Sequence, residues 1–442
     1  MAPNPPSRRQ FLAAAAAAGL AGCLSDVTGS DGTPTDPPTS AYDPTVEQDE
    51  WPKYDEDWEP PTDSPLDYEY ETEVLVENLD IPWDISFTGE DELFLTERTG
   101  NIRKFESGDV VDVVEPDEAI DAGSIDSPDE QTWWVEGGEG GLLGVAAHPD
   151  YPDPPLVYAY YTYMDGGAEK NKVASFDASA DDPASTVTTL VEGIPGESYH
   201  DGGRIAFGPE GHLWVTTGDG GTAENSQSTE SLGGKVLRIT ASGDPVEGNT
   251  EAGDGRVFSL GHRNPQTITW LPDATPVVSE HGQTAQDEVS LISPGWNGGW
   301  PEVRTAEEYP GSDYNRPVAH TGANTSWAPS GGVFYTGESV PGLQNRLLVG
   351  GLWSQRINVV TLSPPDGDLP PVGNGKRHDA DWLDNGYVAT SHHLFEDEFG
   401  RIRHVEQGPD GDLYFITCNR DGRAEGDFPK DNGDRLIRLR QV

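Results

Sequence analysis

The chain has 442 residues, with 27 Lys and Arg against 78 Asp and Glu, so its formal net charge is −51. This balance excludes a nucleic-acid partner, because a phosphate backbone binds to basic surfaces. The acidic residues are spread over the whole chain. We interpret them as the solvated surface of a halophile's protein, since molar salt screens self-repulsion beyond about 3 Å.

The first residues predict export from the cell. Residues 8–12 read RRQFL, which is similar to a twin-arginine motif, and an alanine-rich apolar run follows. That run is too short to span a membrane, which takes about 20 apolar residues. Residues 20–23 read LAGC, which is similar to a lipoprotein cleavage site. We therefore expect residues 1–23 to be a signal and Cys23 to carry lipid. This anchor would be the only contact with the membrane and would hold the protein on its outer face, or the protein would be extracellular.

Residues 24–69 are rich in Pro, Ser, Thr, Asp and Glu, and Lys53 is their only basic residue. Such a segment buries too little apolar surface to order itself, so the composition predicts a disordered stalk. The folded domain is expected to be residues 70–442. Besides Cys23 the chain has one cysteine, Cys418, so no internal disulfide is expected if Cys23 is lipidated.

The rest of the chain shows short alternating apolar runs separated by Gly, Pro and Asp, a pattern typical of all-β folds. One unit, a turn of the Pro-Asp-Gly type followed by a short hydrophobic strand, occurs six times at intervals of roughly 55–70 residues. The copies lie at 87–96, 148–158, 208–215, 271–278, 335–349 and 408–415. Six copies predict a six-bladed β-propeller with four-stranded blades. Residues 435–439 are expected to close the ring by pairing with residues 70–76. A β-sandwich is the alternative, but it does not explain six copies at this spacing.

Five glycine-containing loop segments carry polar residues that point to chemistry. They are residues 136–144, 199–204, 261–266, 280–288 and 400–403. The loops at one end of a propeller converge on its central channel, so these segments are expected to meet there. His200 precedes a glycine-rich turn, and Asp219 ends the strand pattern that follows. A histidine beside a carboxylate is the usual make-up of an oriented general base.

Several strings in these regions resemble the glucose/sorbosone dehydrogenase family, soluble quinoproteins that bind pyrroloquinoline quinone (PQQ) and oxidise aldose sugars. The likeness runs from about Ile81 to the C-terminus, and the chain resembles a secreted member of haloarchaeal type. The strings that carry the resemblance are GEGGLLG at 138–144, HDGGR at 200–204, GGKVLRI at 233–239, GHRNPQ at 261–266, DE at 287–288, NGGWP at 297–301 and APSG at 328–331. The resemblance implies a six-bladed propeller, in agreement with the repeat count.

The resemblance also implies a role for individual residues. His200 matches the general base that takes a proton from the sugar's anomeric hydroxyl, while Asp219 orients that histidine and Arg263 stabilises negative charge on the quinone. The matches to residues that seat the cofactor are Glu139, Asn264, Arg401 and Arg403. Backbone carbonyls at Gly282 and Gln283 match ligands of a calcium ion, which prefers oxygen. The implied activity is PQQ- and calcium-dependent oxidation of an aldose to its lactone, with electrons passing to an external acceptor.

Two positions depart from the family pattern. Trp353 stands where the family usually has a lysine or arginine beside the quinone, and His404 stands where an aspartate is usual. Trp353 therefore supports a first alternative, a propeller without cofactor that binds a carbohydrate or a protein. A second alternative is a calcium-dependent hydrolase of the lactonase type, which also uses a six-bladed ring. Such a hydrolase has no evident need for an arginine pair at 401 and 403.

Overall fold

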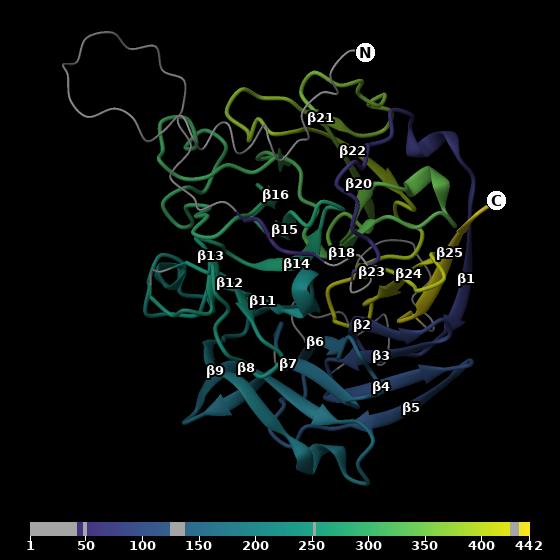
Figure 1. Ribbon diagram of the computed structural model, residues 1–442, viewed down its shortest axis with the longest axis vertical. Coiled ribbons are helices and arrows are strands. Elements are labelled where there is room, and N and C mark those ends of the chain that lie inside the picture. The colour runs from purple at the N-terminus through teal and green to yellow at the C-terminus, as the bar shows by residue number, and fades with distance from the viewer. Residues whose placement is uncertain (1–41, 47–50, 124–137, 251–252, 425–432) are drawn as a thin grey trace.

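The computed structural model describes residues 42–46, 51–123, 138–250, 253–424 and 433–442 (Figure 1). Over these residues the protein is built from β-strands and a few short 3-10 turns, arranged as six antiparallel sheets around a central axis. The predicted six-bladed β-propeller is confirmed. The 3-10 turns are η1 (Pro65–Asp67), η3 (Pro183–Thr186), η4 (Pro209–Gly211), η5 (Ala223–Ser226) and η6 (Pro341–Leu343).

Each blade begins with its innermost strand. The first blade contains β2 (Pro82–Gly89), β3 (Glu92–Glu97), β4 (Asn101–Glu106) and β5 (Asp109–Val114). The second contains β6 (Leu142–Ala147), β7 (Leu156–Asp165), β8 (Ala168–Asp177) and β9 (Thr188–Pro195). The third contains β10 (Gly202–Phe207), β11 (Leu213–Thr217), β12 (Lys235–Ile239) and β13 (Val257–Leu260).

The fourth blade contains β14 (Pro265–Trp270), β15 (Pro276–Glu280), β16 (Glu288–Leu291) and β17 (Ala319–His320). The fifth has a fifth strand: its order is β18 (Pro329–Tyr335), β19 (Arg346–Gly351), β20 (Arg356–Ser363), β22 (Val388–Leu394) and β21 (Lys376–His378). The sixth joins β23 (Ile402–Gln407), β24 (Leu413–Thr417) and β25 (Leu436–Gln441) to β1 (Tyr70–Val76) from the other end of the chain.

The repeated sequence unit corresponds to one element in every blade, the turn that joins the innermost strand to the next. In the third blade Gly208 N–H donates to the His212 carbonyl at 3.0 Å, and in the sixth Gly408 N–H donates to Asp412 at 2.9 Å. The strand that follows each turn is buried on both faces, as in β11, where all five residues are buried. Turn and strand recur together because, in each blade, the chain must reverse direction after the innermost strand and then form a buried second strand.

The ring closes where expected. β1 pairs antiparallel with β25, from Tyr70 opposite Gln441 to Val76 opposite Leu436. The buried carboxylate of Asp434 strengthens this junction, since it accepts hydrogen bonds from the backbone N–H groups of Ile81, Asn419 and Arg420. One side chain thus joins the entry to the first blade with the last loop of the sixth.

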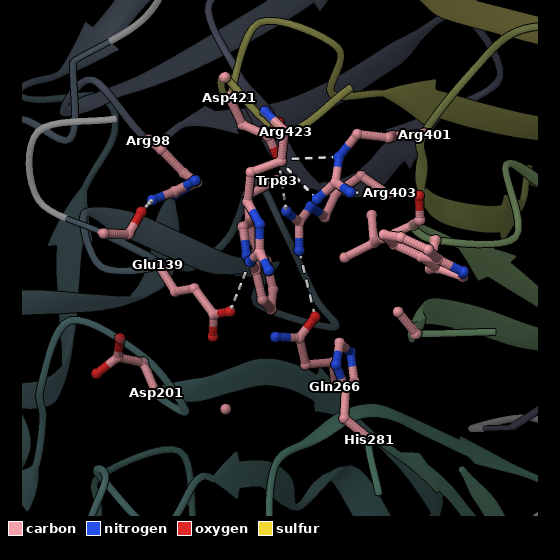
Figure 2. Close-up of a pocket in the computed structure, with 16 residues that line it drawn as sticks. Trp83, Arg98, Glu139, Asp201, Gln266, His281, Arg401, Arg403, Asp421 and Arg423 are labelled. Atoms are coloured by element: carbon pink, nitrogen blue, oxygen red, sulfur yellow. Dashed lines mark hydrogen bonds and ion pairs between the residues drawn. The ribbon is translucent and has the colours of Figure 1, made fainter. Parts of the chain in front are cut away.

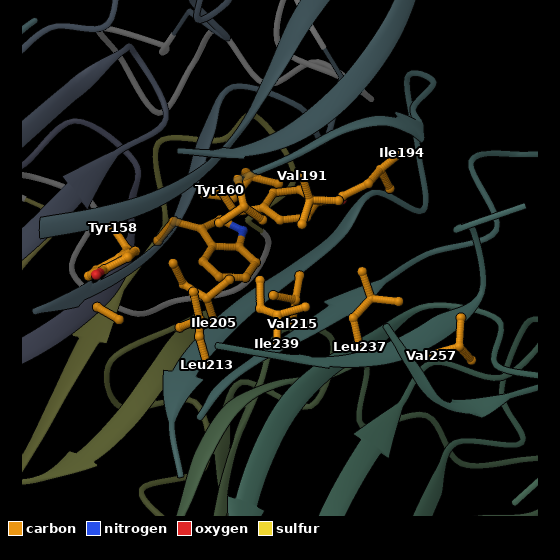
Figure 3. Packing of buried hydrophobic residues seen from close by; sticks show 14 residues of the cluster. Tyr158, Tyr160, Val191, Ile194, Ile205, Leu213, Val215, Leu237, Ile239 and Val257 are labelled. Carbon is orange, nitrogen blue, oxygen red and sulfur yellow. The ribbon is translucent and has the colours of Figure 1, made fainter. Parts of the chain in front are cut away.

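Neighbouring blades pack through apolar side chains. Figure 3 shows the cluster between the second and third blades, where Tyr158 and Tyr160 of β7 pack with Ile205 of β10 and Val215 of β11. Trp83 of β2 belongs to the same cluster and is 1% exposed. The core therefore fills the spaces between sheets and leaves polar side chains at the axis.

The prediction of a disordered stalk is wrong for residues 51–69, which pack on the propeller. Trp58 is 2% exposed, its ring lies 5.3 Å from that of Phe334, and Arg346 binds the carboxylate of Asp63 at 2.8 Å. Tyr42 also packs edge-on against Trp214 at 5.9 Å. Composition predicted disorder because the segment is polar on average, whereas Trp51 and Trp58 pack into apolar clusters of the third, fourth and fifth blades.

The predicted signal (residues 1–23), with the proposed lipidation site Cys23, and residues 24–41 of the predicted stalk lie outside the described residues. In the part of the chain that the structure describes, none of the helical segments has the length and apolar character to span a bilayer. Cys418 is a buried free thiol.

Candidate active site

A cavity of about 330 Å³ opens at the end of the axis where two kinds of loop meet (Figure 2). One kind precedes the innermost strand of a blade and the other joins its second and third strands. The residues lining the cavity are Trp83, Arg98, Gly138, Glu139, Asp201, Gly202, Gln266, His281, Ala328, Leu352, Trp353, Arg401, Arg403, Asp421, Gly422 and Arg423. All six blades contribute, so the cavity exists only in the closed ring.

Four arginines line this cavity, in a chain with a large excess of acids. Arg401 donates from Nε and Nη2 to Oδ2 of Asp421, at 3.0 and 2.8 Å. Arg403 donates from Nη1 to Oε1 of Gln266 at 3.2 Å. Figure 2 shows this pair on one side of Trp83, with Arg98 on the other. The predicted pair 401 and 403 is therefore brought to the cavity, where Asp421 already neutralises the charge of Arg401.

Arg98 is fixed by the loop before β6, since its Nε donates to the Gly140 carbonyl at 2.9 Å and its Nη2 to that of Gly138. Burial lowers the pKa of Arg98 to about 10, which leaves it charged at neutral pH. Arg423 donates to Oε1 of Glu139 at 3.2 Å. The cavity wall thus carries positive charge on two opposite sides.

Two carboxyl groups in the cavity have opposite electrostatic surroundings. Burial alone would raise the pKa of Glu139, but the neighbouring histidines 200 and 281, the His200 N–H and Arg423 outweigh it and lower the pKa to about 2. Burial raises the pKa of Asp201 to about 7, although a hydrogen bond from Asn171 opposes the shift. At neutral pH Glu139 is ionised, whereas Asp201 is partly protonated.

His200 and Asp219 form the expected pair. His200 Nδ1 lies 2.8 Å from Asp219 Oδ1, and Trp300 Nε1 donates to Oδ2 of the same carboxylate at 2.9 Å. An ionised carboxylate accepts, so we assign the proton of the neutral ring to Nδ1, which leaves Nε2 with a free lone pair. The His200 N–H donates to Glu139 Oε2 at 3.0 Å, which attaches the histidine to the cavity wall.

The backbone at His200 explains the glycines around it. His200 has φ = 65°, in the left-handed region that side chains rarely adopt. A Cβ added at Gly218 would lie 1.8 Å from the His200 carbonyl oxygen. Gly218 therefore permits the loop after β11, which carries Asp219, to approach the histidine loop closely enough for the hydrogen bond.

Arg263 and Asn264 lie next to this pair. The Asp219 N–H donates to the Arg263 carbonyl at 2.9 Å, and the Arg263 guanidinium lies 5.3 Å from the ring of Trp300. Asn264 accepts from Gly202 N–H at 3.0 Å, so it joins β14 to the start of β10. The structure therefore brings the three predicted catalytic residues together beside the cavity, and Asn264 is bonded to Gly202 in the cavity lining.

Gly282 and Gln283 line a small recess next to Arg263 rather than the main cavity. The Gly282 carbonyl accepts from Arg263 Nη1 at 2.8 Å, and the His281 carbonyl accepts from the same nitrogen at 3.2 Å. Among the described residues there is no group of three or more His, Cys, Asp or Glu side chains that could hold a metal ion. A cation bound here would therefore depend on backbone carbonyls, and Arg263 would have to release that of Gly282.

Trp353 lies at the rim of the cavity with 63% of its surface exposed. Arg356 does not line this cavity and pairs with Glu396 at 2.7 Å. His404 lies deeper along the axis, 3.3 Å from Glu406 and 3.5 Å from Asp84. Neither residue compensates within the cavity for a basic side chain at position 353.

Several buried polar atoms around the cavity have no hydrogen-bond partner within the described ranges. They are Arg403 Nε, Asn264 Nδ2, Arg263 Nε, His281 Nε2 and Asp201 Oδ2. Burying such atoms without partners costs about 1–3 kcal/mol each. Of these residues, Arg403, His281 and Asp201 line the cavity itself. Arg403 Nε can only donate, and with three further arginines in the lining the cavity is suited to a ligand rich in acceptor oxygens.

The sequence did not single out Arg98, Arg423 or Asp421, and it gave no role to Gln266 within the segment 261–266, although all four line the cavity. Arg98 follows β3 and Arg423 follows β24, in loops that join second and third strands. The signal for Arg98 was available: Asp219 occupies the corresponding loop of the third blade, which marks this loop as one that faces the axis.

Comparison with known proteins identifies the family. Residues 79–426 match the family described as Glucose / Sorbosone dehydrogenase. The chain is 27% identical to the aldose sugar dehydrogenase YliI of Escherichia coli, over 79% of this chain and 90% of that protein. It is also 27% identical to quinoprotein glucose dehydrogenase B of Acinetobacter calcoaceticus, over 55% of each chain.

A solved structure is similar in both fold and sequence. The PQQ-bound form of aldose sugar dehydrogenase from Streptomyces coelicolor is 29% identical, with a TM-score of 0.67, over 87% of this chain and all of that one. With the six blades and the converging loops, these matches show that the chain belongs to the glucose/sorbosone dehydrogenase family.

Proposed function

We propose that this protein oxidises aldose sugars to lactones with PQQ as cofactor, and that an external acceptor takes the electrons. The observation that carries the proposal is the His200–Asp219 pair beside a cavity lined by four arginines. Family membership and the PQQ-bound relative support it.

The residues present fit PQQ, which is planar and carries three carboxylates. Arg98, Arg403 and Arg423 offer cationic donors from two sides of the cavity, and Arg403 Nε has no partner among the described residues. When bound, PQQ supplies a quinone that accepts hydride from the anomeric carbon of the sugar. Glu139 links Arg423 to the His200 backbone, so it would fix the base relative to the cofactor site.

His200 would act as the general base. Its Nε2 would take the proton of the anomeric hydroxyl as the carbon loses hydride, and Asp219 would stabilise the resulting imidazolium. Trp300 holds the second oxygen of Asp219, which limits rotation of the carboxylate. Arg263, 5.3 Å from the Trp300 ring, would place positive charge where negative charge develops.

Calcium is the second component that we propose, with the carbonyls of Gly282 and Gln283 as ligands. The recess they line also contains Glu280 and Glu288 besides Arg263 and Arg304, and the two carbonyls would supply the oxygen ligands that calcium prefers. Removal of calcium with a chelator should lower the PQQ-dependent activity, and calcium should restore it while magnesium should not. Unchanged activity after chelation would exclude this component.

We also propose that the chain is exported and anchored by lipid at Cys23. The sequence of residues 8–23 supports this. Mass spectrometry of the N-terminal peptide should find a lipid adduct on Cys23, and a Cys23→Ser variant should be released from the membrane fraction. Peptides that begin upstream of Cys23 in the mature protein would contradict the proposal.

The experiment that tests the function uses purified protein in molar salt with calcium, PQQ and a panel of aldoses, followed by reduction of an artificial dye. We expect sugar-dependent reduction that requires PQQ and falls at least about 10²-fold in His200→Ala. A rise in melting temperature with PQQ tests binding without turnover, since a ligand of the native state stabilises it. Stabilisation by PQQ without turnover of any aldose would contradict the proposed reaction, and no stabilisation would favour a propeller that binds carbohydrate without cofactor.

A further inference from the structure

A second recess, of about 210 Å³, lies on the fifth blade outside the candidate active site. Its lining residues come from β20, β22, β21 with the loop before it, and the loop before β18. The composition of this recess is unlike that of the rest of the molecule.

The recess depends on the extra strand of the fifth blade. β21 pairs with β22 on the outer edge of the sheet and contributes Lys376 and His378. Gly375 permits this pairing, because a Cβ there would lie 1.7 Å from the Ser391 carbonyl oxygen. The inserted segment therefore forms one wall of the recess.

The charge of the recess is opposite to that of the molecule. None of the described residues that line it is an Asp or Glu, whereas Lys376 and Arg356 are both present. Lys376 Nζ donates to the carbonyls of His320 and Thr321, at 3.1 and 3.4 Å, which leaves one of its three N–H bonds for a ligand. Glu396 shares the charge of Arg356 from outside the lining, at 2.7 Å. Asp379, also outside the lining, attracts Lys376. Among the lining groups Lys376 is the main source of positive charge.

The other lining groups are suited to a saccharide. Hydroxyl and amide groups of Thr321, Thr325 and Asn358 can bind sugar hydroxyls, and the Trp327 ring supplies an apolar face.

Residues that are close neighbours in the chain line the recess and the active-site cavity. Ala328 and Trp353 line the cavity, while Trp327 and Arg356 line the recess. Between them Ser354 Oγ donates to the Trp327 carbonyl at 3.3 Å and accepts from Asn358 Nδ2 at 3.3 Å. One chain of sugar units could therefore pass over exposed Trp353 from one hollow to the other.

We propose that this recess is a subsite for an anionic sugar unit, bound while the reducing end of the same acidic oligosaccharide occupies the central cavity. This proposal rests on the proposed function for the identity of the reacting end. Lys376 binds the carboxylate, and the hydroxyl and amide groups around it bind the sugar ring.

The test compares cellobiouronate with cellobiose, two disaccharides that differ by one carboxylate. Binding to the protein without turnover is measured by calorimetry at fixed ionic strength, and KM is measured with PQQ present. We expect cellobiouronate to bind about tenfold more tightly than cellobiose. Lys376→Gln should remove that difference, and Lys376→Arg should retain it.

Arg377→Gln is the matched control. Arg377 lies on the same strand, but its side chain donates to the Pro370 carbonyl and does not line the recess. This variant should keep the preference for cellobiouronate. Equal binding of the two disaccharides, or an equal loss in Arg377→Gln, would overturn the proposal.

Free glucuronate and sulfate distinguish the source of the anion. If either binds in a Lys376-dependent way without competing with cellobiouronate, the recess is an independent anion site and the subsite proposal is wrong. Lys376-dependent binding of cellobiouronate by a protein that oxidises no aldose would support the subsite and reject the proposed function, so the two failures remain distinct.

Discussion

At the scale of single residues, the arrangement of His200 depends on one carboxylate. Asp219 is 2% exposed and accepts from both His200 Nδ1 and Trp300 Nε1. In Asp219→Asn the amide can present its NH2 group to the ring, so Nε2 would carry the proton and could not act as a base. We expect kcat to fall about 10²–10⁴-fold with little change in KM.

Trp300→Phe is the control for Asp219→Asn, because it removes the second donor but leaves the carboxylate. Its kcat should fall less than that of Asp219→Asn, and steady-state kinetics with one aldose measures both. An Asp219→Asn variant with the kcat of the native protein would show that the histidine does not act as the base.

The buried carboxyl group of Asp201 should make the stability of the protein depend on pH. Its pKa rises from 3.8 to about 7 because the group is buried. The folded state therefore holds a proton that the unfolded state has lost between about pH 4 and 7, and this group's contribution to stability declines as pH rises through that range. Asp201→Asn removes the titration while its amide oxygen still accepts from Asn171.

We expect Asp201→Asn to be as stable as the native protein near pH 4 and more stable above pH 7, by on the order of 1–3 kcal/mol. Denaturant midpoints at pH 4.5, 6 and 8 measure this. A constant difference between the two proteins over the whole range would show that Asp201 has an ordinary pKa.

At the scale of elements, residues 51–69 act as a strap across three blades. Trp58 is 2% exposed and packs against Phe334 and Tyr387. Replacing a buried tryptophan by alanine costs about 3–5 kcal/mol, and Trp58→Ala should lower the free energy of unfolding by this amount. Trp353→Ala is the control with the same change in composition, since Trp353 is 63% exposed and should alter stability by less than about 0.5 kcal/mol. If chemical denaturation gave the two variants equal free energies of unfolding, residues 51–69 would not contribute to the stability of the fold.

The same elements show what the sequence could predict. Local sequence signals were enough to predict the six turns and the pairing of residues 70–76 with the last strand. Each turn repeats the same residue types, and each strand alternates apolar and polar residues. The strap was missed because Trp58 is stabilised by residues more than two hundred positions away, and composition averages over such contacts. Arg98 and Arg423 were missed for a similar reason: only ring closure brings their loops to one cavity.

At the scale of the whole molecule, positive charge is concentrated where ligands are expected. Four arginines line the central cavity and Lys376 faces the recess, although the chain carries a net charge of −51. The field of the surface repels anions at low salt, whereas the two hollows attract them at short range. Salt should therefore speed the association of an acidic oligosaccharide while weakening its contact with Lys376.

The same net charge predicts how stability depends on salt. Repulsion among 78 acidic residues is larger in the compact fold than in the extended chain, and molar salt screens it beyond about 3 Å. We expect the melting temperature to rise by on the order of 10 °C between 0.1 and 2 M NaCl, measured by calorimetry.

Sucrose at equal osmolality is the control, because it is excluded from the surface without screening charge and should stabilise less. A variant with several exposed Asp and Glu residues replaced by Asn and Gln should have a higher melting temperature at 0.1 M NaCl and a smaller increase between 0.1 and 2 M NaCl. A melting temperature that stays constant or falls with NaCl would show that the acidic surface does not strain the fold.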